Sequence, residues 1–208
     1  MEILAQIQAM GDEGRQYEGL WELCEYFNMS MEELLAGFPT DRFIPALVEL
    51  LNYEHNPDIM LLATRAMCYM VEAIPRSAKL VVREGAVPLF CARLLFIQYI
   101  DVAEQTLQIL GKLAKDQAAA VLEAGGLVAI LSYLDFFSLS VQRESVATAA
   151  ALCKSIKREQ FELIENVLPL LSNLLTREDL QSKSTSVSLA RPLTGGQLLK
   201  PVYSRIRD

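Results

Sequence analysis

The sequence predicts an all-α protein built from stacked helical repeats, because one apolar phrase recurs along it at a nearly constant interval. The second position of the phrase is occupied by Pro45, Pro88, Val128 and Pro169, so successive copies are 43, 40 and 41 residues apart. Helical repeats of about 40–47 residues are typical of armadillo and HEAT solenoids. We therefore expect an armadillo/HEAT-like right-handed α-solenoid, in which each repeat packs against its neighbours.

The first full repeat shows how each helix of this solenoid is expected to begin and end. Asn56 and Pro57 have the residue types preferred at an N-cap and at the first helical position, and apolar residues follow them at helical spacing. Pro75 ends this helix. The next segment, residues 77–84, leads to Gly85, where glycine permits a left-handed turn into the following helix.

The same plan recurs along the chain and is incomplete at both ends. Helical spacing over residues 100–113 precedes Gly125, and similar spacing over residues 141–156 precedes Asn166, which is the usual substitute for glycine in a left-handed turn. Residues 17–27 form one helix of an incomplete first repeat. We therefore expect about three full repeats flanked by partial ones.

The repeat pattern ends near residue 175. Residues 181–196 are rich in Ser, Thr and Gly and keep no helical period. We expect residues 1–175 to form the armadillo-repeat domain and residues 176–208 to form a flexible or aberrant tail. The fourth repeat is unfinished and has no polar cap, which suggests a fragment, a truncated isoform or an incomplete gene model.

Composition and charge exclude several classes of protein. The chain is 52% hydrophobic, yet no run reaches the ~18 uncharged apolar residues of a membrane span, and the first residues do not form a secretory signal. Residues 1–175 carry 13 positive and 23 negative side chains, which argues against binding to a phosphate backbone. We expect a nuclear or cytoplasmic protein without nucleic-acid or membrane partners, and one that tolerates basic protein partners.

No residue pattern indicates catalysis. His55, the only histidine, lies in a polar stretch expected to be a loop between two helices. Cys24, Cys68, Cys91 and Cys153 lie far apart at core-type positions, so we expect reduced, buried thiols without a catalytic or metal-binding role. We predict no catalytic residue, no metal, no cofactor and no small-molecule substrate.

Four stretches go beyond the generic pattern of an armadillo repeat, and a short fifth one, GAVP (85–88), accompanies them: FPTDRFIPALV (38–48), LNYEHNPDIMLLA (51–63), YIDVAEQTL (99–107) and LSYLDFFSLSVQR (131–143). The phrase GAVP is shared by all armadillo proteins. The longer stretches resemble the N-terminal armadillo region of large HECT-type E3 ubiquitin ligases. The subgroup is the plant KAKTUS type and the animal thyroid-receptor-interactor type, which act in ubiquitin-fusion degradation. This resemblance covers roughly residues 3–175.

The resemblance implies a role in protein ubiquitination and proteasomal degradation. In this family the armadillo region helps to select substrates, while a HECT domain at the far C-terminus carries the catalytic cysteine. No segment of this chain resembles a HECT domain, so the chain alone is expected to transfer no ubiquitin. The implied role is a non-catalytic substrate-recognition or scaffold segment with protein clients and ubiquitin-pathway proteins as partners. The alternative is a standalone armadillo adaptor without a ubiquitin role, such as a transport or junction scaffold.

Candidate protein-binding residues lie near the starts of three helices and in one aromatic loop. The two phenylalanines of the loop either form an exposed anchor for a partner or, as we favour, pack against the next repeat. Trp21 is expected in the core of the first partial repeat; as the only tryptophan, it also argues against an importin-α-type ladder of Trp and Asn. The candidate residues are Asn56, Asp58, Asp101, Glu104, Tyr133, Asp135, Phe136, Phe137, Gln142 and Arg143.

Overall fold

The computed structural model describes residues 2–29, 35, 37–156 and 167, and the elements it shows there are all helical. Asn166 and the predicted tail, residues 176–208, lie outside this part of the chain. The elements are α1 (Glu2–Ile7), α2 (Glu13–Met29), α4 (Thr40–Leu50), α5 (Pro57–Ala73), α6 (Ser77–Arg83), α7 (Ala86–Leu95), α8 (Ile100–Asp116), α9 (Ala118–Glu123), α10 (Gly126–Ser132), the 3₁₀ turn η1 (Leu134–Phe136) and α11 (Leu139–Lys154).

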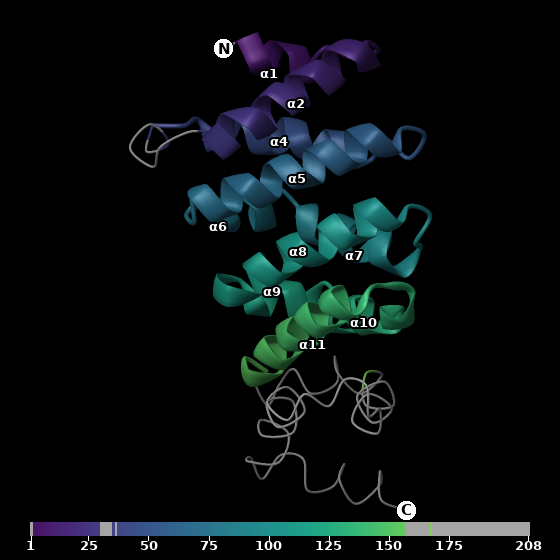
Figure 1. Cartoon of the computed structure of the whole chain (residues 1–208). Helices are drawn as coiled ribbons and strands as arrows, with labels where there is room; N and C mark the ends of the chain where they lie inside the picture. Colours follow the sequence, from purple (N-terminus) through teal and green to yellow (C-terminus); the bar gives the residue numbers. More distant parts are fainter. Residues whose placement is uncertain (1, 30–34, 36, 157–166, 168–208) are drawn as a thin grey trace, which may run out of the picture.

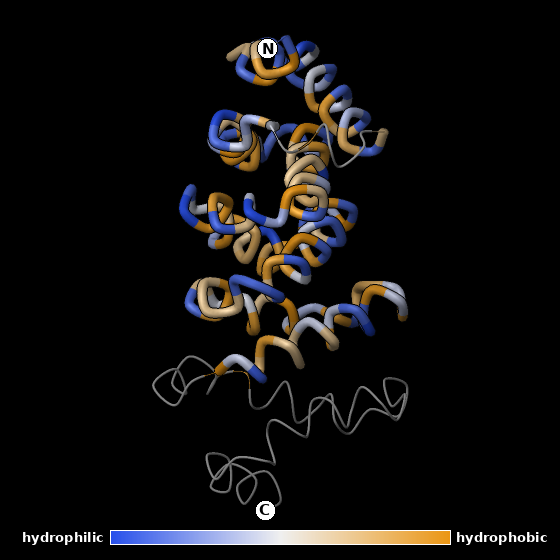
Figure 2. The backbone as a smooth tube through the Cα atoms, turned by 90° about the vertical axis from the view of Figure 1, so that its left-hand side faces the viewer, coloured by the Kyte–Doolittle hydropathy of each residue, from blue (hydrophilic) through white to orange (hydrophobic). Residues whose placement is uncertain are grey.

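The helices stack into an elongated solenoid (Figure 1). The long helices α2, α5, α8 and α11 pack on one another in one layer, while α4, α7 and α10 lie behind them and the short α6 and α9 connect successive repeats. Hydrophobic residues lie on the sides by which neighbouring helices face each other (Figure 2). A unit of short, middle and long helix that stacks on its neighbours is the armadillo-like α-solenoid that the sequence predicts.

The turns between the short and middle helices form at the predicted glycines. Gly85 precedes α7 with a φ of 79°, and Gly125 precedes α10 with a φ of 77°. Backbone in this left-handed region is unstrained for glycine and disfavoured for residues with a Cβ atom. The predicted start of α5 is also confirmed, because the side chain of Asn56 accepts a hydrogen bond from the backbone N–H of Ile59.

The core is continuous along the described repeats. It contains the predicted inward faces of α5 and α8, with Met67 and Leu110 fully buried. Within the described ranges, no helix is long and apolar enough to span a bilayer. The prediction that Trp21 belongs to the core is wrong, because its side chain is 53% exposed. The buried side of α2 is centred on Leu20 and Leu23, and Trp21 lies about 100° around the helix from Leu20.

Gly126 allows a close approach between α9 and α10 that a larger residue would disturb. A Cβ atom there would lie 2.5 Å from Val121 Cγ1 and 2.7 Å from the Val121 carbonyl oxygen. We expect Gly126→Ala to lower the free energy of unfolding by about 1–3 kcal/mol, as in other overpacked cores. Gly14→Ala is the matched control: it lies in α2, where a Cβ meets only Asp12 at 3.5 Å, and should stabilise by roughly 0.5–1 kcal/mol. Urea denaturation measures both, and equal effects would contradict the proposed overlap.

Candidate protein-binding surface

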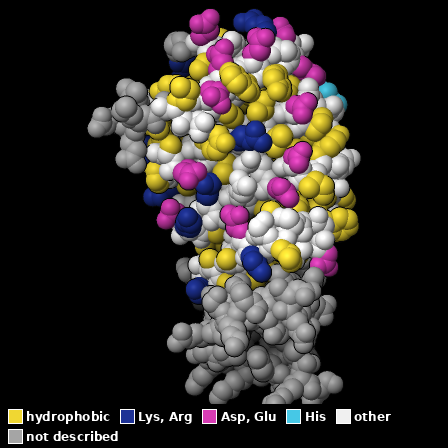
Figure 3. All heavy atoms as spheres, in the orientation of Figure 1, with side chains coloured by type: hydrophobic (Ala, Val, Ile, Leu, Met, Phe, Trp, Pro, Cys, Tyr) yellow, Lys and Arg dark blue, Asp and Glu magenta, His cyan; other side chains and the backbone are white. Residues whose placement is uncertain are grey.

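The four long helices together form one broad surface, which we call the long-helix face. Helix α5 is flanked by α2 and α8 and backed by α4, so only one stripe of it remains open. That stripe consists of Asp58, Leu61, Arg65, Tyr69 and Glu72, which are spaced three or four residues apart. Helices α8 and α11 continue the surface, and Figure 3 shows this face of the molecule.

Several charged side chains of the long-helix face lie at the helix end that favours their sign. Asp58 and Asp101 lie in the first turns of α5 and α8, and Glu104 lies one turn further along α8. Lys115 and Lys154 lie in the last turns of α8 and α11. This arrangement complements the helix dipoles, whose N-terminal ends favour anions and whose C-terminal ends favour cations. In Figure 3 several acidic side chains run down the right half of the face, while acidic and basic side chains are mixed on its left half.

Polar contacts between repeats hold several side chains of this face in place. Lys112 Nζ lies 2.7 Å from Glu72 Oε2, which joins α8 to α5. Arg65 Nε donates to Gln105 Oε1 at 3.3 Å, and Gln105 in turn donates to Gln108. Within the described ranges, the carboxylates of Asp58, Asp101 and Glu104 have neither a hydrogen bond nor an ion-pair partner. These three carboxylates are therefore open to a ligand.

Asn56 and Gln142, two of the predicted residues, are engaged in the fold itself. Asn56 Nδ2 donates to Glu13 Oε2 at 2.7 Å, and His55 Nε2 lies 2.9 Å from Glu13 Oε1. The pKa of Glu13 is lowered, mainly by the hydrogen bond with Asn56 and to a smaller extent by the hydrogen bond with His55. The buried side chain of Gln142 donates to the backbone carbonyl of Phe137 at 2.8 Å. These contacts join α2 to the loop before α5 and shape the loop before α11.

The aromatic loop before α11 divides its two phenylalanines between core and surface. Phe137 is only 6% exposed, whereas Phe136 is 67% exposed and packs edge-on against Tyr133 with ring centroids 5.9 Å apart. Phe137 therefore packs as we favoured, whereas Phe136 has the exposure that an anchor for a partner would need. Asp135 and, on α11, Arg143 are also exposed. A role of this loop in binding stays a prediction.

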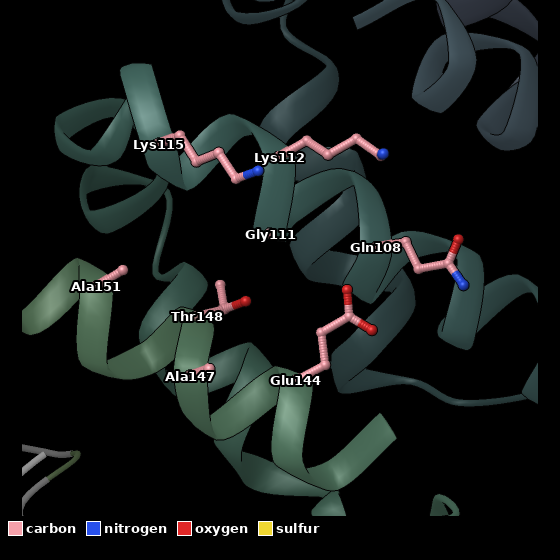
Figure 4. A pocket seen from close by; sticks show the side chains of 8 residues that line it. All are labelled: Gln108, Gly111, Lys112, Lys115, Glu144, Ala147, Thr148 and Ala151. Atoms are coloured by element: carbon pink, nitrogen blue, oxygen red, sulfur yellow. The ribbon is translucent and has the colours of Figure 1, made fainter. Parts of the chain in front are cut away.

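A cavity of about 370 Å³ opens between α8 and α11 on the long-helix face (Figure 4). The cavity is not evident from the sequence, because most of its walls are small or generic residues whose juxtaposition depends on the register of two helices. Its lining consists of Gln108, Gly111, Lys112, Lys115, Glu144, Ala147, Thr148 and Ala151.

The four cysteines are free and buried, as predicted. Burial raises the pKa of Cys24 to about 12 and the pKa values of Cys68, Cys91 and Cys153 to about 11. A nucleophilic or metal-binding cysteine requires the thiolate, which burial suppresses here. Among the described residues, no group of three or more His, Cys, Asp or Glu side chains is placed to bind a metal.

Comparison with known proteins identifies similar ubiquitin ligases. The family described as "E3 ubiquitin-protein ligase TRIP12-like, TPR repeats" matches residues 1–123. The chain is 48% identical to E3 ubiquitin-protein ligase UPL3 of Arabidopsis thaliana over 85% of its length. It is 44% identical to E3 ubiquitin-protein ligase TRIP12 of Danio rerio over 98% of its length. The chain spans only 9% and 10% of the lengths of these two relatives.

Comparison with solved structures identifies the same architecture in armadillo proteins. A designed armadillo repeat protein in complex with the peptide (KR)4 matches with a TM-score of 0.76 at 19% identity, covering 99% of this chain and 86% of that one. The family description mentions TPR repeats, which have a period of 34 residues and two helices each. The steps of 40–43 residues in this chain and its three-helix units are those of armadillo repeats.

Proposed function

Because the chain belongs to the TRIP12-like family of E3 ubiquitin-protein ligases, we propose that it is a non-catalytic segment that binds protein clients for a HECT-type ligase. Transfer of ubiquitin through a cysteine needs an accessible thiolate, and burial keeps all four thiols of this chain protonated. In this proposal the repeats hold the client while catalysis takes place on another segment or polypeptide. The role also implies a nuclear or cytoplasmic location.

The row of open carboxylates on the long-helix face carries the proposal and indicates clients with basic segments. Asp58 on α5 and Asp101 and Glu104 on α8 lie on neighbouring helices of one face. Packed helices lie about 8–10 Å apart, and an extended chain advances about 3.3 Å per residue. Lys or Arg at about every third residue of an extended client would therefore reach successive helices. That a designed protein of this fold is seen with the basic peptide (KR)4 supports the proposal.

Reversing charge in the acidic row should weaken the binding of basic peptides. In Asp101→Lys/Glu104→Lys, a Lys- and Arg-containing peptide loses two attractions and meets two repulsions, so we expect at least a tenfold loss of affinity at low ionic strength. Fluorescence anisotropy of the full chain with the labelled peptide measures this. Glu123→Lys in α9, an exposed acidic residue outside the long-helix face, should change the affinity less than twofold. Unchanged binding by the double variant would contradict the assignment of this surface.

Client selection for a ligase is distinguishable from a generic adaptor role by the fate of the bound proteins. The tagged full chain is used to capture partners from cells with and without proteasome inhibition, and the partners are quantified by mass spectrometry. The proposal predicts partners that accumulate when the proteasome is inhibited, together with ubiquitin-pathway proteins. Partners of transport or junction type whose amounts do not change would favour the standalone adaptor instead.

A further inference from the structure

The cavity between α8 and α11 combines opposite charges with a floor of small residues. Gly111, Ala147 and Ala151 leave the space open, and the hydroxyl of Thr148 points into it (Figure 4). The helices approach closely at this point, since a Cβ at Gly111 would lie 3.0 Å from Thr148 Oγ1. The cavity is therefore a consequence of how α8 and α11 pack against each other.

The two ends of the cavity differ in charge. Lys115 lies at one end, near Ala151, and Glu144 lies at the other, opposite Gln108. In the part of the chain that the structure describes, neither Lys115 nor Glu144 has a hydrogen bond or an ion-pair partner. Lys112, between them, is already paired with Glu72 of α5. One free cation and one free anion thus remain to contact a ligand, and they lie at opposite ends.

From this geometry we infer that the cavity is a client subsite for an extended peptide segment that carries an acidic and a basic side chain about three residues apart. The acidic side chain contacts Lys115, the basic side chain contacts Glu144, and a bulky apolar side chain between them fills the space above the small residues. Lys115 and Gln108 are separated by roughly 10 Å along α8 at about 1.5 Å per residue. Three residues of extended chain cover the same distance at about 3.3 Å each.

The inference rests on the proposed client-binding function and adds a selection rule to it. The acidic row of Asp58, Asp101 and Glu104 favours basic residues in general. The cavity adds a preference for one carboxylate at a set distance from a lysine or arginine. A client that is merely basic would bind to the acidic row and leave Lys115 without a partner.

The test is a set of double-mutant cycles between the full chain and four labelled peptides. The parent peptide has Glu and Lys three residues apart with Leu between them; the other three replace Glu, Lys or both by Gln. Anisotropy titrations use the native chain, Lys115→Gln, Glu144→Gln and the control Lys79→Gln on the exposed side of α6. We expect Lys115→Gln to weaken at least threefold only those peptides that contain Glu, and Glu144→Gln to weaken at least threefold only those that contain Lys. Lys79→Gln should affect none.

Two outcomes would overturn the inference, and each is distinguishable from a failure of the proposed function. Equal effects of Lys115→Gln on peptides with and without Glu would show that it acts only through the overall charge. If all Lys-containing peptides bind with equal affinity, with or without Glu, the cavity is not a subsite for an acidic side chain. The proposed role of the acidic row would be unaffected. The proposed function itself would be contradicted only if the variant Asp101→Lys/Glu104→Lys bound basic peptides as tightly as the native chain.

Discussion

Replacing Phe90 with alanine is expected to destabilise the chain by about 3–5 kcal/mol, the range for aromatic side chains removed from a core. Phe90 is 1% exposed and is the largest fully buried side chain among the residues that the structure describes. It lies in α7, which contacts α6, α8 and α10, so the substitution removes packing between two successive repeats. For a chain of this size, each kcal/mol lowers the melting temperature by roughly 2–4 °C. Thermal unfolding followed by circular dichroism should therefore show a decrease of about 10 °C.

Phe96→Ala makes the same chemical change where little packing is lost. Phe96 follows α7 and is 79% exposed, so its replacement should change the free energy of unfolding by less than about 0.5 kcal/mol. A solenoid is held together by contacts between neighbouring repeats. For this reason Phe90→Ala should also broaden the transition, as the two sides of the weakened junction separate. Equal shifts for the two variants would contradict the assignment of Phe90 to the junction.

Alkaline pH is expected to unfold the chain because all four thiols are buried in protonated form. Exposed thiols ionise near pH 8.5, whereas burial raises the pKa values of Cys68, Cys91 and Cys153 to about 11 and that of Cys24 to about 12. Stability is therefore unaffected below about pH 8.5 and falls as the pH rises towards 11, where the unfolded chain releases protons that the folded chain keeps. Each thiol contributes a loss of roughly 1.4 kcal/mol per pH unit in this interval.

Four such thiols give a loss of roughly 5 kcal/mol per pH unit, which is comparable to the whole stability of many domains, about 5–15 kcal/mol. Urea denaturation at pH 7.5, 8.5, 9.5 and 10, with a reductant present, measures this slope. Cys91→Ala removes one of the four thiols and should reduce the slope by about a quarter, whatever it does to stability at pH 7.5. An unchanged slope in this variant would show that other groups cause the alkaline transition.

The repeat architecture was predictable from the sequence because its signals are local and recur. The apolar phrase recurs every 40–43 residues, and Gly85 and Gly125, which precede α7 and α10, adopt the predicted left-handed conformation. The surface was less predictable. Phe136 and Phe137 are adjacent and chemically identical, yet only Phe137 is buried, and the packing that separates them is not visible in the sequence.

Other features depend on how helices from different repeats meet. Trp21 is predicted to be a core residue because it follows Leu20 in an apolar stretch. In the structure it lies on the exposed side of α2, away from the buried residues. The α8–α11 cavity arises where Gly111 meets Thr148, 37 positions later. Asp58, Asp101 and Glu104 are among the candidate binding residues that the sequence suggests, but their lack of partners within the described repeats is visible only in three dimensions.

The polar contacts between long helices have a consequence for how such a chain can change length. Arg65 and Gln105 are 40 positions apart, and so are Glu72 and Lys112; this separation is nearly one repeat. A duplication or loss of one whole period would place equivalent side chains at the same separation and preserve the junction. An insertion of a few residues inside a long helix would instead rotate it by about 100° per residue and misalign every such pair. The architecture therefore favours growth by whole repeats over gradual lengthening.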